Sequence, residues 1–106
     1  MYKIILCCQN GASTDLLAVK MEEAAKEKGI DVCINAHPYT ELGFEIENVD
    51  LVLLAPQIRF KKNTLEKTYA SYNKPFMCIE PSDYGLLRGE HVLNEAINLI
   101  ESTKKK

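Results

Sequence analysis

Four short apolar segments, separated by segments with helical periodicity, set the strongest constraint on how this chain folds. The apolar segments are residues 3–7, 31–36, 50–55 and 76–79. Strands that are apolar along their whole length are buried on both faces, and their alternation with helices is typical of a parallel sheet. We therefore predict an α/β fold, a three-layer sandwich with a four-stranded parallel sheet between helices.

The segments between the strands predict the helices. Asn63 and Glu66 are spaced as a helix start, and this helix would end before Asn73-Lys74-Pro75. Gly29 stands where a helix commonly ends, and a further short helix fits around residues 40–44. Apolar residues at helical spacing mark the first helix, with Leu17, Met21 and Ala24, and the last one, with Leu93, Ala96, Ile97 and Ile100.

The length of the chain matches one domain, because domains usually contain about 100–150 residues. We predict one domain over residues 1–103 and a frayed basic tail over residues 104–106. The longest apolar run, residues 51–56, is far shorter than the ~20 residues of a membrane-spanning helix. We therefore expect no direct insertion into a membrane.

The charge and cysteine patterns argue against several classes of function. Thirteen Lys and Arg against fifteen Asp and Glu give a net charge of -2, whereas nucleic-acid-binding proteins carry a basic excess. The four cysteines contain no C-x-x-C pair, and neither Cys nor His occurs at zinc-site spacing. We therefore expect reduced thiols in the cytosol, no bound metal, no cofactor and no nucleic-acid partner.

The topology of such a sheet predicts where the functional site lies. Right-handed crossovers leave few arrangements, one of which is the flavodoxin-like strand order 2-1-3-4. In that order ligands bind at the carboxyl ends of strands 1 and 3, where the strand order reverses. Two loops, residues 8–14 and 56–60, would then form the site.

The segment between the first strand and the first helix has the composition of a phosphate-binding loop. Gly11 permits a tight turn in which backbone N–H groups point at an anion, and the helix N-terminus adds partial positive charge. Ser13 and Thr14 supply hydroxyl donors or cap the helix. The loop comprises Cys8, Gln9, Asn10, Gly11, Ala12, Ser13 and Thr14.

Cys8 is the candidate nucleophile because it opens this loop. Amide groups that bind phosphate also stabilise a thiolate, and a thiolate aimed into a phosphate site attacks phosphoryl groups. The alternative is that Cys8 is a small buried apolar residue in an ordinary strand–helix connection. Strand alternation places Cys7 on the opposite face, in the core. Cys33 and Cys78 lie within strands and are interpreted as packing residues.

A loop that begins with Cys is similar to the C-x5-R-[S/T] loop of the low-molecular-weight tyrosine phosphatases. Thr14 stands here where that loop has Arg, and Asp15 follows. The guanidinium stabilises phosphate oxygens in the transition state, so its absence favours holding a phosphoryl group over hydrolysing it. This difference indicates a carrier rather than a phosphatase.

Two stretches of the chain resemble the enzyme IIB components of the bacterial phosphoenolpyruvate–sugar phosphotransferase system, of the lactose/cellobiose (β-glucoside, chitobiose) type. The first is Lys3-Ile4-Ile5-Leu6-Cys7-Cys8-x-x-Gly11-x-Ser13-Thr14-x-Leu16-Leu17, followed by Lys20-Met21. The second is Asp50-Leu51-Val52-Leu53-Leu54-Ala55-Pro56-Gln57-Ile58, and Asn73-Lys74-Pro75 and Tyr84-Gly85 agree as well. The resemblance covers nearly the whole chain and implies the same phosphate loop after strand 1.

The resemblance implies that Cys8 receives a phosphoryl group from a histidine of an enzyme IIA. Cys8 would pass it to a β-linked disaccharide or glucoside, usually at the 6-hydroxyl, held by the membrane-embedded enzyme IIC during uptake. The backbone amides of residues 9–14 would hold the phosphate oxygens. The protein would be cytoplasmic and transiently located at the inner face of the membrane with enzyme IIC.

The loop departs from the pattern of that family at Gln9, Asn10, Ala12 and Asp15. The family commonly has small residues after the Cys, Met after the Gly, and Ser or Asn after Ser-Thr. A carboxylate facing the loop would repel phosphate, so we expect Asp15 to point outward, where it suits the helix dipole. These differences leave the role of Cys8 intact and bear on the sugar and on partner docking.

Two sites in the second loop carry weaker hypotheses. Gln57 would either contact a phosphate oxygen beside the Cys8 loop or be an ordinary polar loop residue. Arg59, Lys61 and Lys62 would either attract an acidic partner or form a solvated face.

Three other features are interpreted mainly as structural. The segment Asp83-Tyr84-Gly85 is similar to the general-acid loop of the small tyrosine phosphatases, but without the loop Arg we interpret it as a turn. His37 and His91 have no charge-relay or metal-ligand company at a recognisable spacing. His37, before Pro38, is the better candidate for a partner contact.

Two other functions remain open. The same loop would serve a thiol phosphatase or an arsenate-reductase-like enzyme, against which Thr14 argues. A regulatory domain would keep the fold and Cys8 and respond to phosphorylation without catalysing transfer.

Overall fold

A computed structural model describes residues 1–9 and 15–104 of the chain. Its strands are β1 (Tyr2–Cys8), β2 (Val32–Pro38), β3 (Leu51–Leu54) and β4 (Phe76–Cys78). Its α-helices are α1 (Asp15–Glu27), α2 (Leu42–Glu45), α3 (Lys62–Thr68), α4 (Pro81–Gly85) and α5 (Gly89–Lys104). Short 3-10 helices are η1 (Tyr39–Glu41), η2 (Ile46–Asn48), η3 (Pro56–Lys61) and η4 (Ala70–Tyr72). Within the described residues the four strands form one parallel sheet of order β2-β1-β3-β4, which confirms the predicted order.

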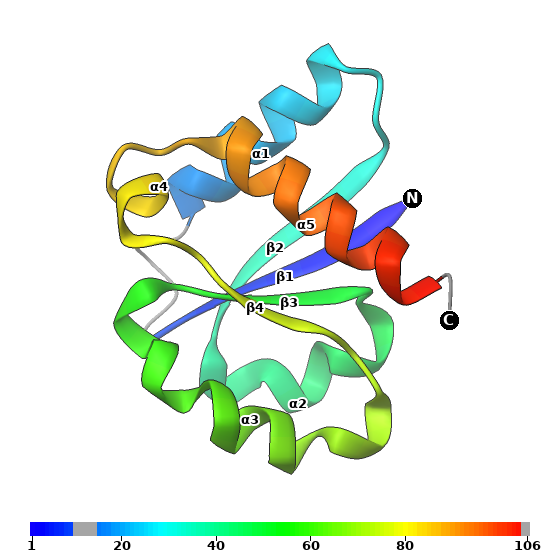
Figure 1. The fold of residues 1–106 in the computed structure, drawn as a ribbon, viewed down its shortest axis with the longest axis vertical. Coiled ribbons are helices and arrows are strands. Elements are labelled where there is room, and N and C mark those ends of the chain that lie inside the picture. The colour runs from blue at the N-terminus through cyan, green and yellow to red at the C-terminus, as the bar shows by residue number, and fades with distance from the viewer. Residues whose placement is uncertain (10–14, 105–106) are drawn as a thin grey trace.

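Helices cover both faces of this sheet (Figure 1). α1 and α5 lie on one face, and α2 and α3 lie on the other. The side chains of β1 alternate between the two layers, so Ile4 and Leu6 pack on the α1–α5 side, and Ile5 and Cys7 pack on the α2–α3 side. All four are at most 1 % exposed, which confirms the predicted three-layer sandwich.

The first helix ends as its sequence predicts. Gly29 has a φ of 69°, a conformation that side-chain-bearing residues rarely adopt. The N–H of the next residue, Ile30, donates a hydrogen bond of 2.9 Å to the Ala25 carbonyl oxygen. The glycine thus lets the chain turn from α1 into β2 while the last helical carbonyl groups remain bonded.

The helices after β2 and β3 differ in detail from the prediction. α3 begins at Lys62, not at Asn63, and no side chain caps its start. It ends at Thr68, and the chain then turns at Asn73, whose φ is 56°. The short helix predicted around residues 40–44 is present as α2.

The last helix, α5, includes the first residue of the predicted basic tail. Lys104 is the last residue of α5, and its Nζ lies 5.3 Å from the centre of the Tyr2 ring. The Tyr2 hydroxyl donates a hydrogen bond to the Glu101 carboxylate. An ammonium group at this distance from an aromatic ring is attracted to its face. Residues 105–106 of the predicted tail lie outside the described residues, so the tail stays a prediction.

The described helices are short and amphipathic. The two longest, α1 and α5, contain 13 and 16 residues and bury one side against the sheet. Among the described residues, no helix has the length and apolar character that crossing a membrane requires.

Candidate functional site

The predicted site lies at the carboxyl end of β1. Cys8 is the last residue of this strand, and the register pairs it with Pro38 of β2. On the other side, the Ala55 N–H donates a hydrogen bond of 2.9 Å to the Cys7 carbonyl oxygen. α1 then lies on one face of the sheet, while the chain leaves β3 toward the other face (Figure 1). Cys8 therefore stands where the strand order reverses, the place at which such sheets bind ligands.

The two adjacent cysteines have different environments. Cys7 is 0 % exposed, and burial, with a smaller contribution from neighbouring Cys8, raises the pKa of its thiol to about 12. Cys7 therefore lies in the core, as predicted, and its thiol is protonated at neutral pH. Cys8 is 2 % exposed.

The expected separation of these cysteines to opposite faces is not seen in the packing. Cys7 and Cys8 both belong to the core on the α2–α3 side of the sheet. The reason is the position of Cys8 at the last residue of the strand, beside the end of β3. Ala55, which follows β3, belongs to the same core.

Most of the predicted phosphate loop lies outside the described residues. Gln9 is described and exposed. Asp15 is the first residue of α1 and is also exposed, and its orientation relative to the loop stays a prediction. The residues outside the description are Asn10, Gly11, Ala12, Ser13 and Thr14, so phosphate binding by this loop stays a prediction.

The second loop, η3, lines a hollow of about 520 Å³. It begins directly after Ala55, whose N–H contacts the end of β1. Gln57 is exposed, and Phe60 is 72 % exposed. The hollow is lined by Pro56, Gln57, Arg59, Phe60 and Pro81. Gln57 thus lies in the loop expected beside Cys8, and its contact with phosphate stays a prediction.

The three cations at the end of η3 and the start of α3, namely Arg59, Lys61 and Lys62, do not act as one cluster. The Lys62 Nζ lies 3.3 Å from the Glu66 carboxylate, and the Lys61 Nζ lies 4.9 Å from the centre of the Tyr39 ring. Arg59 is exposed and lines the hollow, and the described part of the chain offers it no ion pair. Arg59 is therefore the cation of this loop that is most open to a partner.

The other cysteines and His37 lie in or beside the strands. Cys33 and Cys78 are in β2 and β4, as predicted, and both are partly exposed. Burial raises the pKa of the Cys78 thiol. The His37 Nδ1 lies 3.2 Å from the Glu41 carboxylate, and its contact with a partner stays a prediction.

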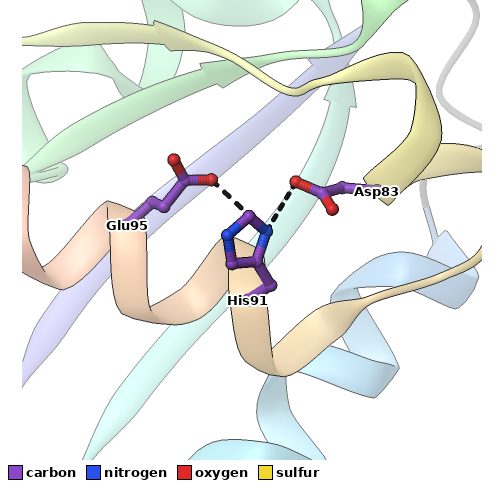
Figure 2. Close-up of side chains that lie close together, drawn as sticks. All are labelled: Asp83, His91 and Glu95. Atoms are coloured by element: carbon purple, nitrogen blue, oxygen red, sulfur yellow. Dashed lines mark hydrogen bonds and ion pairs between the residues drawn. The ribbon is translucent and has the colours of Figure 1, made fainter.

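The segment expected to be a turn before the last helix contains a buried carboxylate. Residues 81–85 form α4, and Asp83 is 2 % exposed. Its Oδ2 lies 2.8 Å from the His91 Nδ1 (Figure 2), and its Oδ1 lies 3.5 Å from the Arg88 guanidinium. A carboxylate held in this way is engaged with its own chain, which agrees with the structural interpretation of this segment.

His91 lies beside two carboxylates that the sequence analysis did not predict. Its Nδ1 lies 3.7 Å from the Glu95 carboxylate as well as 2.8 Å from Asp83. The spacing of four residues between His91 and Glu95 is a signal that was present in the sequence. Asp83 precedes a turn at Leu87, whose φ is 52°. The contact between Asp83 and His91 across this turn cannot be predicted from their spacing in the sequence.

The fold and the position of Cys8 together define a class of protein, the α/β proteins that place a cysteine at the carboxyl end of the first strand of a parallel sheet. Residues 3–95 match the family described as "PTS system, Lactose/Cellobiose specific IIB subunit". The chain belongs to this family of sugar-phosphotransferase components.

Relatives of the chain carry the names of different sugars. It is 34% identical over 100 residues to the "PTS system oligo-beta-mannoside-specific EIIB component" of Bacillus subtilis, covering 94% of this chain and 97% of that protein. It is 37% identical over 102 residues to the "PTS system galactose-specific EIIB component" of Lactococcus lactis subsp. cremoris, covering 92% and 94%. The solution structure of a cellobiose-specific phosphotransferase IIB component protein from Borrelia burgdorferi superposes with a TM-score of 0.80 at 40% identity, covering 95% and 93%.

Proposed function

We propose that this protein carries a phosphoryl group on Cys8 between two partners. It accepts the group from the phosphohistidine of an enzyme IIA and delivers it to a β-linked disaccharide or glucoside held by the membrane enzyme IIC during uptake. The family supports this proposal. The observation that carries it is the position of Cys8 at the carboxyl end of β1, between β2 and β3, where the strand order reverses.

In the first step, the Cys8 thiolate attacks the phosphorus of the phosphohistidine in line with the P–N bond. The S–P bond forms as the P–N bond breaks, and the histidine nitrogen keeps the electron pair and takes up a proton. The backbone amides of residues 9–14 and the N-terminus of α1 would hold the three remaining oxygens.

Cys7 does not compete for the phosphoryl group. Its thiol is fully buried, and its pKa of about 12 keeps it protonated at neutral pH. A protonated thiol is a poor nucleophile. At this end of β1 the phosphoryl group therefore has Cys8 as its acceptor.

In the second step, a sugar hydroxyl attacks the phosphorus of the phosphocysteine. The O–P bond forms, the S–P bond breaks, the Cys8 sulfur leaves with the electron pair, and the hydroxyl proton passes to solvent or to a base of enzyme IIC. Thr14 stands where the phosphatases have the loop Arg. Without that guanidinium, attack by water lacks a large electrostatic stabilisation, so the phosphoryl group is kept for the sugar.

In this proposal the sugar-binding pocket belongs to a partner protein. The sugar is held by enzyme IIC, so this chain needs no sugar pocket of its own. Residues 1–103 would act as one IIB domain in the cytoplasm that meets enzyme IIC at the inner face of the membrane. Gln57 and Arg59, both exposed in η3, are the side chains that we expect to contact the phosphate and the partner.

Intact mass measurement tests this function. The protein is incubated with phosphoenolpyruvate, the general phosphotransferase proteins and an enzyme IIA of the lactose/cellobiose type. We expect one phosphoryl adduct on the wild type and none on Cys8→Ser. Cys33→Ser, which removes a partly exposed thiol outside the site, is the matched control and keeps the adduct.

Two results would contradict the proposal. An adduct of equal yield on Cys8→Ser would place the phosphoryl group elsewhere. No adduct on the wild type, together with turnover of an aryl phosphate, would identify a thiol phosphatase instead. Loss of the adduct on adding membranes with enzyme IIC and cellobiose would extend the proposal to the second step.

A further inference from the structure

Asp83, His91 and Glu95 bring three metal-ligating atoms together on the side of the molecule formed by α4 and α5 (Figure 2). Two carboxylate oxygens and one imidazole nitrogen all lie within 4.8 Å of one another. The His91 Nδ1 is 2.8 Å from the Asp83 Oδ2 and 3.7 Å from the Glu95 Oε1. Ligands that each lie about 2.1 Å from one ion stand roughly 3–4 Å apart. The three atoms therefore already have nearly the spacing of ligands that share an ion.

The three side chains combine one fixed ligand with two adjustable ones. The Asp83 side chain, from α4, is 3 % exposed and is held in place by its surroundings. His91 and Glu95 lie four residues apart on one face of α5, and their side chains are 57 % and 46 % exposed. An ion can reach the cluster from solvent, and the two exposed side chains can close on it.

The two oxygens of Asp83 face different partners. Oδ1 lies 3.5 Å from the Arg88 Nη1, and Oδ2 faces His91. Arg88 is thus paired with the Asp83 oxygen that the ion does not need, and its side chain is half exposed. The contact between the Asp83 Oδ2 and the His91 Nδ1 occupies the position that an ion would take.

We propose that this cluster binds a divalent transition-metal ion of the zinc type. The ligands are the Asp83 Oδ2, the His91 Nδ1 and the Glu95 Oε1, and water completes the coordination. An imidazole nitrogen suits Zn²⁺, Cu²⁺ and Ni²⁺, whereas Mg²⁺ and Ca²⁺ prefer oxygen ligands alone. On binding, the His91 ring carries its proton on Nε2 and gives Nδ1 to the ion.

The ion would fasten α4 to the first turns of α5. Both helices follow β4, whose carboxyl end lies at the same edge of the parallel sheet as Cys8. Binding to the folded state alone raises its stability, so Tm would rise with the concentration of the ion. The proposal is independent of phosphotransfer, and the two can fail separately.

A titration of the whole chain with Zn²⁺ tests the site, followed by calorimetry and by NMR of the backbone amides. We expect one site, shifts of the amide signals of residues 83–95, and a higher Tm. His91→Gln keeps a side-chain N–H donor for the buried Asp83, and Glu95→Gln changes an exposed side chain; circular dichroism verifies that both variants fold, and each should weaken binding at least about tenfold. His37→Gln is the matched control, because His37 also has a glutamate four residues on, Glu41, and the described residues add no third ligand there.

Thiols also bind zinc, so the titration is repeated on Cys8→Ser and Cys33→Ser, which should bind as the wild type does. Unchanged affinity in His91→Gln would overturn the proposal. So would shifts confined to the cysteines, or no binding of Zn²⁺ at millimolar concentration.

Discussion

Gly89 at the start of α5 packs directly on the backbone of Lys20 in α1. A Cβ placed on Gly89 would lie 2.5 Å from the Lys20 carbonyl carbon and 2.6 Å from the Met21 nitrogen. Backbone atoms in the middle of a helix cannot move aside as the end of a flexible side chain can. Only glycine therefore allows α5 to lie this close to α1 on their shared face of the sheet.

Gly89→Ala is expected to lower the free energy of unfolding by about 2–3 kcal/mol, because forcing an extra methyl group into a packed contact typically costs about 1–3 kcal/mol. Gly85→Ala is the matched control, since a Cβ there meets nothing within 4 Å. It should change stability by less than about 1 kcal/mol. Urea unfolding followed by circular dichroism measures both, and equal losses would show that the contact does not set the helix spacing.

The buried thiol of Cys7 predicts a loss of stability in alkali. Its pKa is about 12 in the folded protein against 9.0 for an exposed thiol. Above pH 9 the thiol of the unfolded chain releases its proton, whereas the folded protein keeps it. The contribution of Cys7 to the free energy of unfolding is therefore fully present below pH 9 and falls as the pH rises toward 12. At 1.36 kcal/mol per pH unit the loss reaches about 2 kcal/mol at about pH 10.5.

Urea unfolding of the wild type and of Cys7→Ala between about pH 8 and pH 10.5 checks this. Cys7→Ala costs about 1–2 kcal/mol at neutral pH through the lost packing. The difference between the two proteins should then shrink as pH rises, because the alanine variant has no proton to release. A constant difference over this range would contradict the assignment, and Cys33→Ala should retain the slope of the wild type.

The missing loop Arg predicts how long the phosphocysteine survives. Thr14→Arg would supply a guanidinium at the phosphatase position, and we expect hydrolysis of the phosphoryl adduct to accelerate about tenfold or more. Thr14→Gln adds length without the charge and should leave the rate near that of the wild type. The decay of the adduct, followed by intact mass after removal of the donor, gives the rates. Identical decay in all three proteins would show that other groups set the lifetime.

The exposed ring of Phe60 predicts a contact with the phosphoryl donor. Phe60 is 72 % exposed and lines the hollow of η3, the loop that follows β3 and Ala55, whereas Phe44, 81 % exposed, lies on α2. Phe60→Ala should raise the KM for phosphorylated enzyme IIA about tenfold, equivalent to ~1.4 kcal/mol, with little change in kcat. Phe44→Ala should change neither. Steady-state transfer rates give KM and kcat for both variants. Equal effects of Phe60→Ala and Phe44→Ala would show that η3 is not part of the docking surface.

The parts of the fold that follow from the sequence are those with only one way to be buried. The apolar runs of β1 and β3 cannot be placed at a surface, so their positions were predicted to within one or two residues. Gly29 was assigned correctly because a positive φ is a local requirement. The position of Cys8 at the end of its strand also follows from local sequence, because the strand, the loop and the first helix are consecutive along the chain.

The parts that did not follow depend on contacts between distant residues. α4 has five residues, too few to show helical periodicity, and it was predicted as a turn. The contact between Asp83 and His91 requires the turn at Leu87, whose left-handed conformation leucine rarely adopts. Cys8 packs on the same side of the sheet as Cys7 because of the neighbouring strand β3. The alternation of side chains along β1 alone cannot predict this packing.

The contact of Lys104 with Tyr2 places both ends of the described chain at the amino end of β1 (Figure 1). The strand β1 has seven residues and is about 20 Å long, and Cys8 lies at its other end. A fluorophore, an affinity tag or a fused domain attached at either terminus would therefore extend away from the reacting sulfur. The protein can be immobilised on a sensor surface through either terminus with its Cys8 edge turned toward a partner in solution.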